Sequence, residues 1–348
     1  MPSPRAFLRS VLPFLVGIPL LAVLQAVTPP DYQLIVVNIG VNVVLAVSLN
    51  VVNGFTGQFS LGHAGFMAVG AYTAAKITLA LSGVQLAFLP EAASDQVVFA
   101  VALGAGMGAA ALAGFLVGMP SLRLRGDYLA IVTLGFGEII RSIIENMAFL
   151  GQATGLSGLP PFTNIVWVGV SALATVVMAR RLAISTQGRA LFAIREDEVA
   201  AEAMGVDTTG YKVRAFVISA AYAGLAGGLI AHAILLTTPR MFTFVRSMEV
   251  VVMVVLGGLG SITGSIVAAA VLTVALEALR EFQQYRMVVY ALLLIVLMLA
   301  RPQGIFGTRE LWDLRLFRRL PRPRTLAPTP GGASPTEVRD EGGRGGQA

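Results

Sequence analysis

The sequence predicts an all-α protein that crosses a membrane several times, and three observations lead to this fold class. The chain has 348 residues, of which 56% are hydrophobic and only 13% charged, whereas a soluble domain has about 25% charged residues. A spanning helix needs about 20 apolar residues, and apolar segments fill most of the chain between residues 7 and 300. These segments are apolar on every side, unlike the alternating strands of a membrane β-barrel. The composition therefore excludes a water-soluble architecture and favours spanning helices.

The apolar segments predict the helices in order. The first, about 7–27, follows Arg5 and Arg9 and is too long for the apolar part of a typical signal peptide, so we expect an uncleaved first span. Later apolar runs lie near 33–53, 59–82, 97–119, 128–149, 163–180, 213–236, 248–280 and 287–300.

Basic residues predict how these helices are oriented. Six lie between Arg180 and Arg214 and seven arginines between Arg301 and Arg324, and both segments should be cytoplasmic by the positive-inside rule. Nine simple spans from a cytoplasmic N-terminus would place the second segment outside. The 248–280 run, about 50 Å long as a straight helix, is therefore expected to enter from outside, break and return. About eight crossings plus this re-entrant unit place both termini in the cytoplasm.

Two glycine clusters predict interrupted helices in the two halves of the chain. Paired interruptions are typical of transporters built from structural repeats; close packing of small residues is the alternative, and the favoured one for the glycines of 104–118. The glycines assigned to the two breaks are Gly54, Gly57, Gly62, Gly257, Gly258, Gly260 and Gly264.

Polar residues accompany the first break. Gln58, Ser60 and His63 lie there, close to Asn50 and Asn53. They could bind a polar substrate, or they could satisfy the backbone groups that the break leaves free.

Three charges lie inside the predicted 128–149 helix. Glu138, Arg141 and Glu145 share one helical face, where the arginine can pair with either carboxylate. Charges at membrane depth are costly and point to function. We weigh a neutral structural clasp against contact with a translocation pathway.

A polar segment between two apolar runs predicts a short amphipathic helix from Arg189 to Met204 that ends at a glycine. With no span to pack on, it is expected to dock on another protein; lying on the membrane surface is the alternative. The residues assigned to this helix are Arg189, Arg195, Glu196, Asp197, Glu198, Ala200, Ala201 and Gly205.

Several chemistries are excluded by composition. The chain has two lysines, Lys76 and Lys212, and neither lies in a Gly-Lys-Ser/Thr phosphate loop. The absence of cysteine removes thiol chemistry, and two histidines make a His-based zinc site improbable. We expect no bound cofactor or metal. The net charge of +6 is assigned to topology rather than to nucleic-acid binding.

Several motifs together resemble the LivM-type permease subunit of branched-chain amino acid ABC transporters. They are Gly188-Arg189-Ala190, Arg195 to Glu198, Ala200-Ala201 with Gly205, Arg123 to Glu138, Gly257 to Gly264, and Arg301-Pro302-Gln303-Gly304. The resemblance covers about residues 35–307. The general importer pattern is Glu-Ala-Ala-x-x-x-Gly, from which this chain departs because Glu198 stands one residue early and Val199 takes the acidic position.

The resemblance implies an importer in the bacterial inner membrane, made with a homologous second permease, two cytoplasmic ATPase subunits that use ATP and Mg, and a periplasmic substrate-binding protein. The permease domain would be 1–307, with a coupling loop at 181–212, and the Pro- and Gly-rich 308–348 a disordered cytoplasmic tail. The expected substrates are branched-chain or related amino acids. The alternatives are an ABC permease for urea, an amide or a sugar, and a self-sufficient secondary transporter that uses Glu138.

Overall fold

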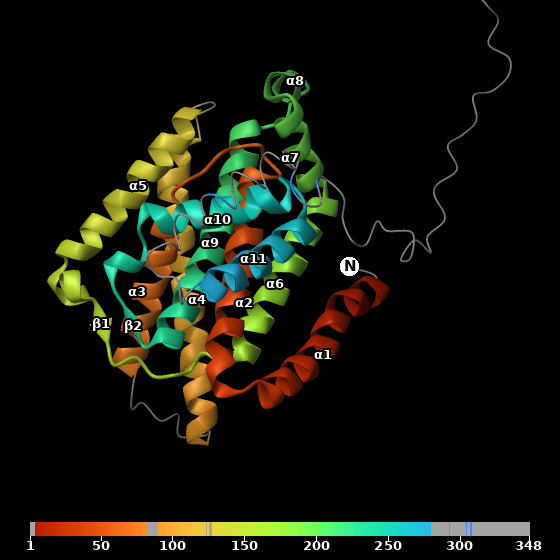
Figure 1. Ribbon diagram of the computed structural model, residues 1–348. Coiled ribbons are helices and arrows are strands. Elements are labelled where there is room, and N and C mark those ends of the chain that lie inside the picture. Colours follow the sequence, from red (N-terminus) through yellow and green to blue (C-terminus); the bar gives the residue numbers. More distant parts are fainter. Residues whose placement is uncertain are drawn as a thin grey trace, which may run out of the picture. The chain divides into compact units, whose positions relative to one another are not determined.

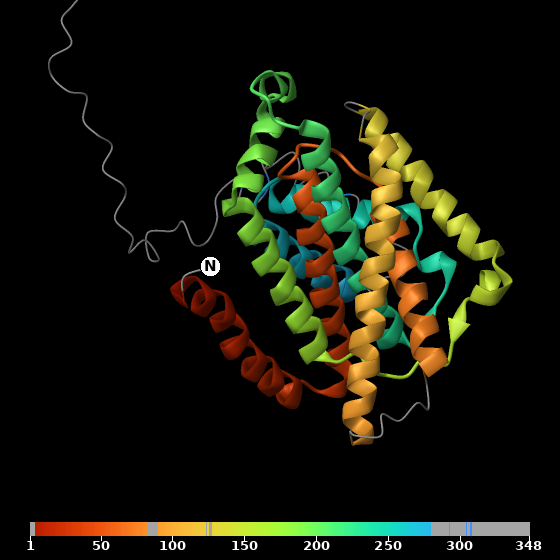
Figure 2. The same cartoon turned by 180° about the vertical axis from the view of Figure 1, so that it is seen from behind.

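The computed structural model describes residues 4–81, 90–122, 124, 127–279, 292, 304 and 307, and helices dominate these ranges (Figures 1 and 2). The α-helices are α1 (Pro4–Val27), α2 (Pro30–Asn53), α3 (His63–Leu81), α4 (Glu91–Ser121), α5 (Asp127–Asn146), α6 (Ile165–Ile184), α7 (Thr186–Glu196), α8 (Glu198–Ala203), α9 (Thr208–Ile234), α10 (Phe244–Gly257) and α11 (Ile262–Ala278). Short 3-10 turns lie at η1 (Ala148–Leu150), η2 (Gln152–Thr154) and η3 (Pro239–Met241). The strands β1 (Leu156–Ser157) and β2 (Leu236–Thr237) form one antiparallel pair.

Five of the described helices are long and apolar enough to cross a membrane. They are Tyr32–Asn53, His63–Leu81, Ala93–Ser121, Ile165–Ile184 and Thr208–Ile234. The all-α, polytopic fold class is thus confirmed, whereas the count of eight crossings is not. The predicted run at 287–300, apart from residue 292, and the predicted tail at 308–348 lie outside the described residues.

The core is built where α3, α4 and α9 approach closely beside α2 (Figure 1). A Cβ added at Gly106 would lie 2.8 Å from the carbonyl oxygen of Gly70, and one at Gly224 would lie 2.8 Å from that of Gly106. These three helices therefore meet backbone to backbone, as small residues allow in membrane proteins. Gly104 and Gly108 instead face open space, so only part of the 104–118 cluster serves packing.

Polar side chains fix where several helices begin. An N-cap side chain accepts a hydrogen bond from the first turn of α6, α7, α8, α9 and α11, which satisfies backbone donors that have no helical partner. The caps are Asn164, Ser185, Asp197, Asp207 and Ser261.

Candidate coupling and transport site

The two predicted helix breaks lie against each other. Residues 54–62 separate α2 from α3, and residues 258–261 separate α10 from α11. Asn50, in the last turn of α2, joins them: its Nδ2 donates to the carbonyl of Ser261 at 3.0 Å and its Oδ1 accepts from the amide of Gly260 at 2.9 Å. One side chain thus connects two segments that are about 210 residues apart in the sequence. This is expected if the two interruptions form one structural unit.

The glycines of the breaks divide into two groups. Gly57, Gly258 and Gly260 have positive φ values of 70°, 109° and 90°, a backbone region that other residues adopt at a cost. The remaining four permit close approach: a Cβ at any of them would meet backbone or a buried side chain. Those four are Gly54, Gly62, Gly257 and Gly264.

The polar residues of the first break mostly bond within the chain. His63 is buried and its Nε2 lies 3.1 Å from Ser48 Oγ. The amide of Ser60, also buried, donates to Asn53 Oδ1 at 3.2 Å. Gln58 instead lines a cleft of about 300 Å³ between the break and α7. These contacts favour the second interpretation, in which Ser60 and His63 stabilise the broken segment.

The predicted single helix from Arg189 to Met204 is wrong, because the chain forms two helices here. Asp197 is extended, with φ −156° and ψ 107°, and ends α7. Its carboxylate then accepts from the amides of Val199 and Ala200, at 2.9 and 3.0 Å, and so begins α8. Gly205, with φ 84°, follows α8 as the predicted glycine stop.

The expectation that this segment has nothing in the chain to pack on is also wrong. Leu191 and Ile194 of α7 are buried. The ring of Phe192 lies 5.1 Å, between centroids, from that of Phe55 in the first break. Arg195 Nη1 donates to the carbonyl of Gly54 at 2.8 Å. The inner face of α7 is therefore seated on the first break.

Helix α8 projects from the other helices (Figure 1). Val199 and Met204 are 62% and 85% exposed, whereas Ala201 faces inward and is buried. Glu198 Oε2 lies 2.5 Å from Nζ of Lys212 on α9, and the lysine side chain is only 2% exposed. Glu198, the residue that departs from the importer pattern, thus anchors α8 to α9.

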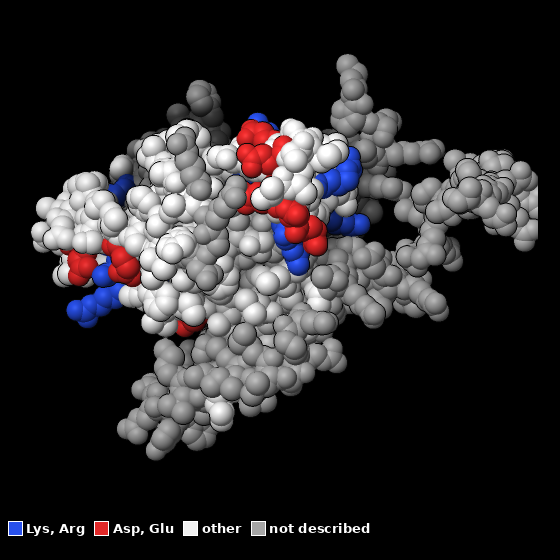
Figure 3. All heavy atoms as spheres, turned by 90° about the horizontal axis from the view of Figure 1, so that it is seen from above, with Lys and Arg blue, Asp and Glu red and all other residues white. Residues whose placement is uncertain are grey.

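Charged side chains gather at the end where α8 projects (Figure 3). Glu196, Asp197 and Glu202 are exposed there. Exposed arginines lie near them, on α7 and at the end of α6: Arg180, Arg181 and Arg189. Exposed charged residues of both signs and the exposed apolar residues Val199 and Met204 therefore belong to the same part of the chain.

The charged residues of α5 pair as their spacing predicts. Arg141 Nε lies 2.7 Å from Glu138 Oε2, and Arg141 Nη1 lies 2.8 Å from Glu145 Oε2. All three side chains are partly exposed, and the two ion pairs stay within one helix.

A second charged cluster escaped the sequence analysis. Arg246 of α10 pairs with Glu249 at 2.9 Å and donates to Asn42 Oδ1 at 2.6 Å. Asn42 Nδ2 in turn donates to Thr273 Oγ1 at 2.8 Å, so the cluster joins α10, α2 and α11. The spacing i, i+3 of Arg246 and Glu249 was a usable signal, but nothing local indicates the contact with Asn42.

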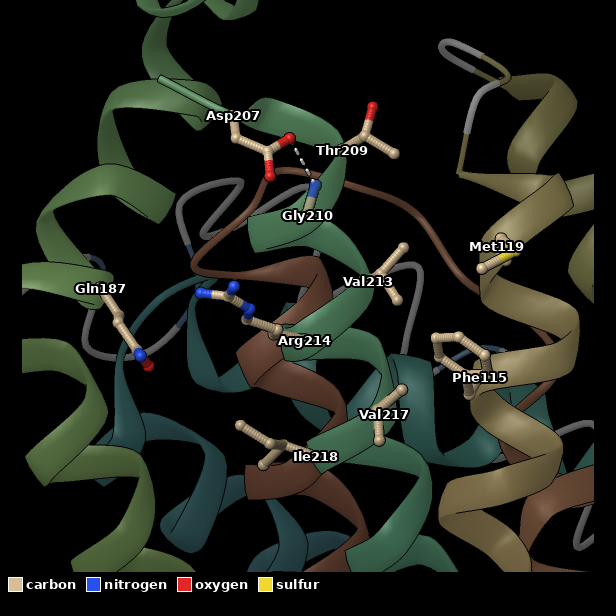
Figure 4. Close-up of a pocket in the computed structure, with 10 residues that line it drawn as sticks. All are labelled: Phe115, Met119, Gln187, Asp207, Thr209, Gly210, Val213, Arg214, Val217 and Ile218. Atoms are coloured by element: carbon tan, nitrogen blue, oxygen red, sulfur yellow. Dashed lines mark hydrogen bonds between the residues drawn. The ribbon is translucent and has the colours of Figure 1, made fainter. Parts of the chain in front are cut away.

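A groove of about 750 Å³ runs over the first turns of α9, between α4 and α7 (Figure 4). Phe115 and Met119 of α4 face Val213 and Val217 of α9, and Arg214 points toward the α7 side. Such mostly apolar walls suit a lipid chain or a helix better than a polar solute. We therefore place no substrate there.

Among the residues described, no group of three acidic, histidine or cysteine side chains could hold a metal ion.

Comparisons with known proteins identify relatives. Residues 33–299 match the model of the family described as branched-chain amino acid transport system / permease component. The chain is 38% identical over 298 residues to the high-affinity branched-chain amino acid transport permease LivM of Salmonella typhimurium and of Escherichia coli K12, covering 76% of this chain and 67% of each relative. It is 28% identical to LivH of Salmonella typhimurium over 291 residues, 76% of this chain and 91% of the relative. No solved structure matches.

Proposed function

Since the chain belongs to the family of branched-chain amino acid transport permease components, we propose that it is the LivM-like permease of an ATP-driven importer of branched-chain or related amino acids. It is a multi-pass membrane protein, and its similarity to both LivM and LivH supports pairing with a homologous second permease. We further propose two cytoplasmic ATPase subunits that use ATP and Mg, a periplasmic substrate-binding protein, and cytoplasmic termini.

One observation carries the proposal: α7 is packed within the chain, whereas Val199 of the next helix, α8, and Met204 directly after that helix are exposed. Exposed apolar residues ringed by charge are typical of a docking surface. Because Glu196, Asp197 and Glu202 are exposed beside them, the groove that receives α8 is expected to be basic.

The arrangement suits mechanical coupling without covalent chemistry. Closure of the ATPase dimer would displace α8, and α7 would pass that displacement to the helix breaks on which it is seated. The residues of the predicted coupling helix thereby divide: Arg195, Glu198 and Ala201 face the chain, whereas Glu196, Asp197 and Ala200 are exposed.

We assign the Glu138–Arg141–Glu145 cluster to stabilising α5 rather than to ion translocation. Both carboxylates bind the same guanidinium, which lowers the cost of placing them in a membrane.

Uptake by proteoliposomes tests the function. With the second permease, the ATPase subunits and the binding protein present, uptake of a branched-chain amino acid should require ATP. Val199→Arg should lower uptake more than about tenfold, because it would place a cation against a basic docking groove, whereas Val199→Ile keeps the apolar contact and should retain uptake, and both variants should insert normally. Uptake by this chain without ATPase subunits would contradict the proposal and support a secondary transporter that uses Glu138. Competition by urea, an amide or a sugar would revise the substrate class.

A further inference from the structure

Arg195 occupies the point where α7 meets both helix breaks. Its Nη1 donates to the carbonyl of Gly54, the residue that follows α2. The last carbonyls of a helix have no partner within it, and a cation there also complements the helix dipole. Arg195 therefore serves as a C-terminal cap of α2, supplied from a segment 141 residues away in the sequence.

The same side chain lies against the second break. A Cβ added at Gly260 would stand 2.8 Å from Arg195 Nη1, and one at Gly57 would stand 3.0 Å from Arg195 Cγ. The guanidinium thus binds the Gly54 carbonyl and lies beside the α-carbon of Gly260. Asn50 holds that second break to α2 through its two hydrogen bonds.

Shape explains why this position holds an arginine. The planar guanidinium can lie beside the backbone of Gly260 while it donates to the Gly54 carbonyl, whereas lysine carries a compact, strongly hydrated charge. Arg189 on the same helix is exposed, so it offers a matched cation outside this junction.

We propose that Arg195 is the positioning residue through which a movement of α7 acts on both helix breaks at once. The inference rests on the proposed function, since it assumes that α8 receives the displacement from an ATPase. Without Arg195, α7 would still carry α8 and contact the first break through Phe192, and the ATPase could still dock, but α7 would lose its direct contact with the second break at Gly260.

The first test separates ATP hydrolysis from uptake in the reconstituted complex. Arg195→Lys should keep ATP hydrolysis while uptake per ATP falls by about tenfold, the scale expected for losing a hydrogen bond to a charged group. Arg189→Lys should leave the ratio unchanged. An unchanged ratio in Arg195→Lys would overturn the inference, although ATP-dependent uptake by the native complex would still support the proposed function.

The second test follows both breaks first with the native arginine in place and then in the Arg195→Lys variant. The chain has no cysteine, so Gln58→Cys and Leu259→Cys each report on one break by their rate of alkylation. In the native complex, both rates should change together between the nucleotide-free and the ATP- and vanadate-trapped states. A change at one break only, or a change at both that persists in Arg195→Lys, would overturn the inference.

Discussion

Helices α7 and α8 follow each other in the chain but have opposite surroundings. In α7, Leu191 and Ile194 are buried and Arg195 binds the backbone of the first break. In α8, by contrast, Val199 is exposed, and so is Met204, which directly follows that helix. This segment is therefore divided into a helix that packs on its own chain, α7, and a helix whose exposed side is available to a partner protein, α8.

The boundary between the two parts is a single residue, Asp197. It ends one helix and caps the next, so the two helices can point in different directions. Glu198 then fastens the base of α8 to Lys212. Substitutions can test this division, because some remove contacts that α7 and α8 make within the chain and others change only exposed side chains.

The largest effect is expected at the anchor of α8. Glu198→Gln removes the carboxylate beside Lys212, whose side chain is nearly inaccessible to solvent, and breaking a buried ion pair costs about 3–5 kcal/mol. The thermal unfolding midpoint of the detergent-purified chain should fall markedly. The double variant Glu198→Gln with Lys212→Met should regain much of the loss; a double variant no more stable than the single one would show that the pair does not anchor α8.

A matched pair of truncations compares the two helices directly. Leu191→Ala should lower the free energy of unfolding by about 3 kcal/mol, because it leaves a cavity under α7. Val199→Ala should change it by less than about 0.5 kcal/mol, because the side chain is mostly in solvent. Denaturation of both purified variants measures this, and equal losses would contradict the division into inward and outward helices.

A smaller effect is expected at the boundary residue. Asp197→Ala removes the N-cap of α8 and should lower the free energy of local unfolding of that helix by about 1 kcal/mol. Hydrogen exchange should become faster in α8 while α7 stays protected, and Glu196→Ala, an exposed neighbour, serves as control. An unchanged rate of hydrogen exchange in α8 would show that the Asp197 cap does not stabilise this helix.

Local patterns in the sequence predict much of this architecture. Apolar runs locate the helices, glycine clusters locate both breaks, and the spacing of Glu138, Arg141 and Glu145 predicts their pairing, since each signal depends on neighbours in the chain. The capping preference of Asp197 was a local signal for the division of the coupling segment, outweighed by the helix formers around it.

Contacts between distant segments could not be predicted in this way. Arg195 and Gly54 are 141 residues apart, and Arg246 and Asn42 are 204 apart. No periodicity of one helix specifies the partner on another, because that partner is fixed by tertiary packing. The count of eight crossings stays a prediction, since most of the apolar run at 287–300 lies outside the described residues.

The central claim, that α8 is the surface on which an ATPase docks, is tested most directly by cross-linking. Met204→Cys gives the chain its only cysteine, at a position 85% exposed. In the assembled complex, a short bifunctional reagent should link this cysteine to an ATPase subunit, and Leu24→Cys on α1 should give no such link. A cross-link from Met204→Cys to lipid alone, with the ATPase bound and unlinked, would contradict the account.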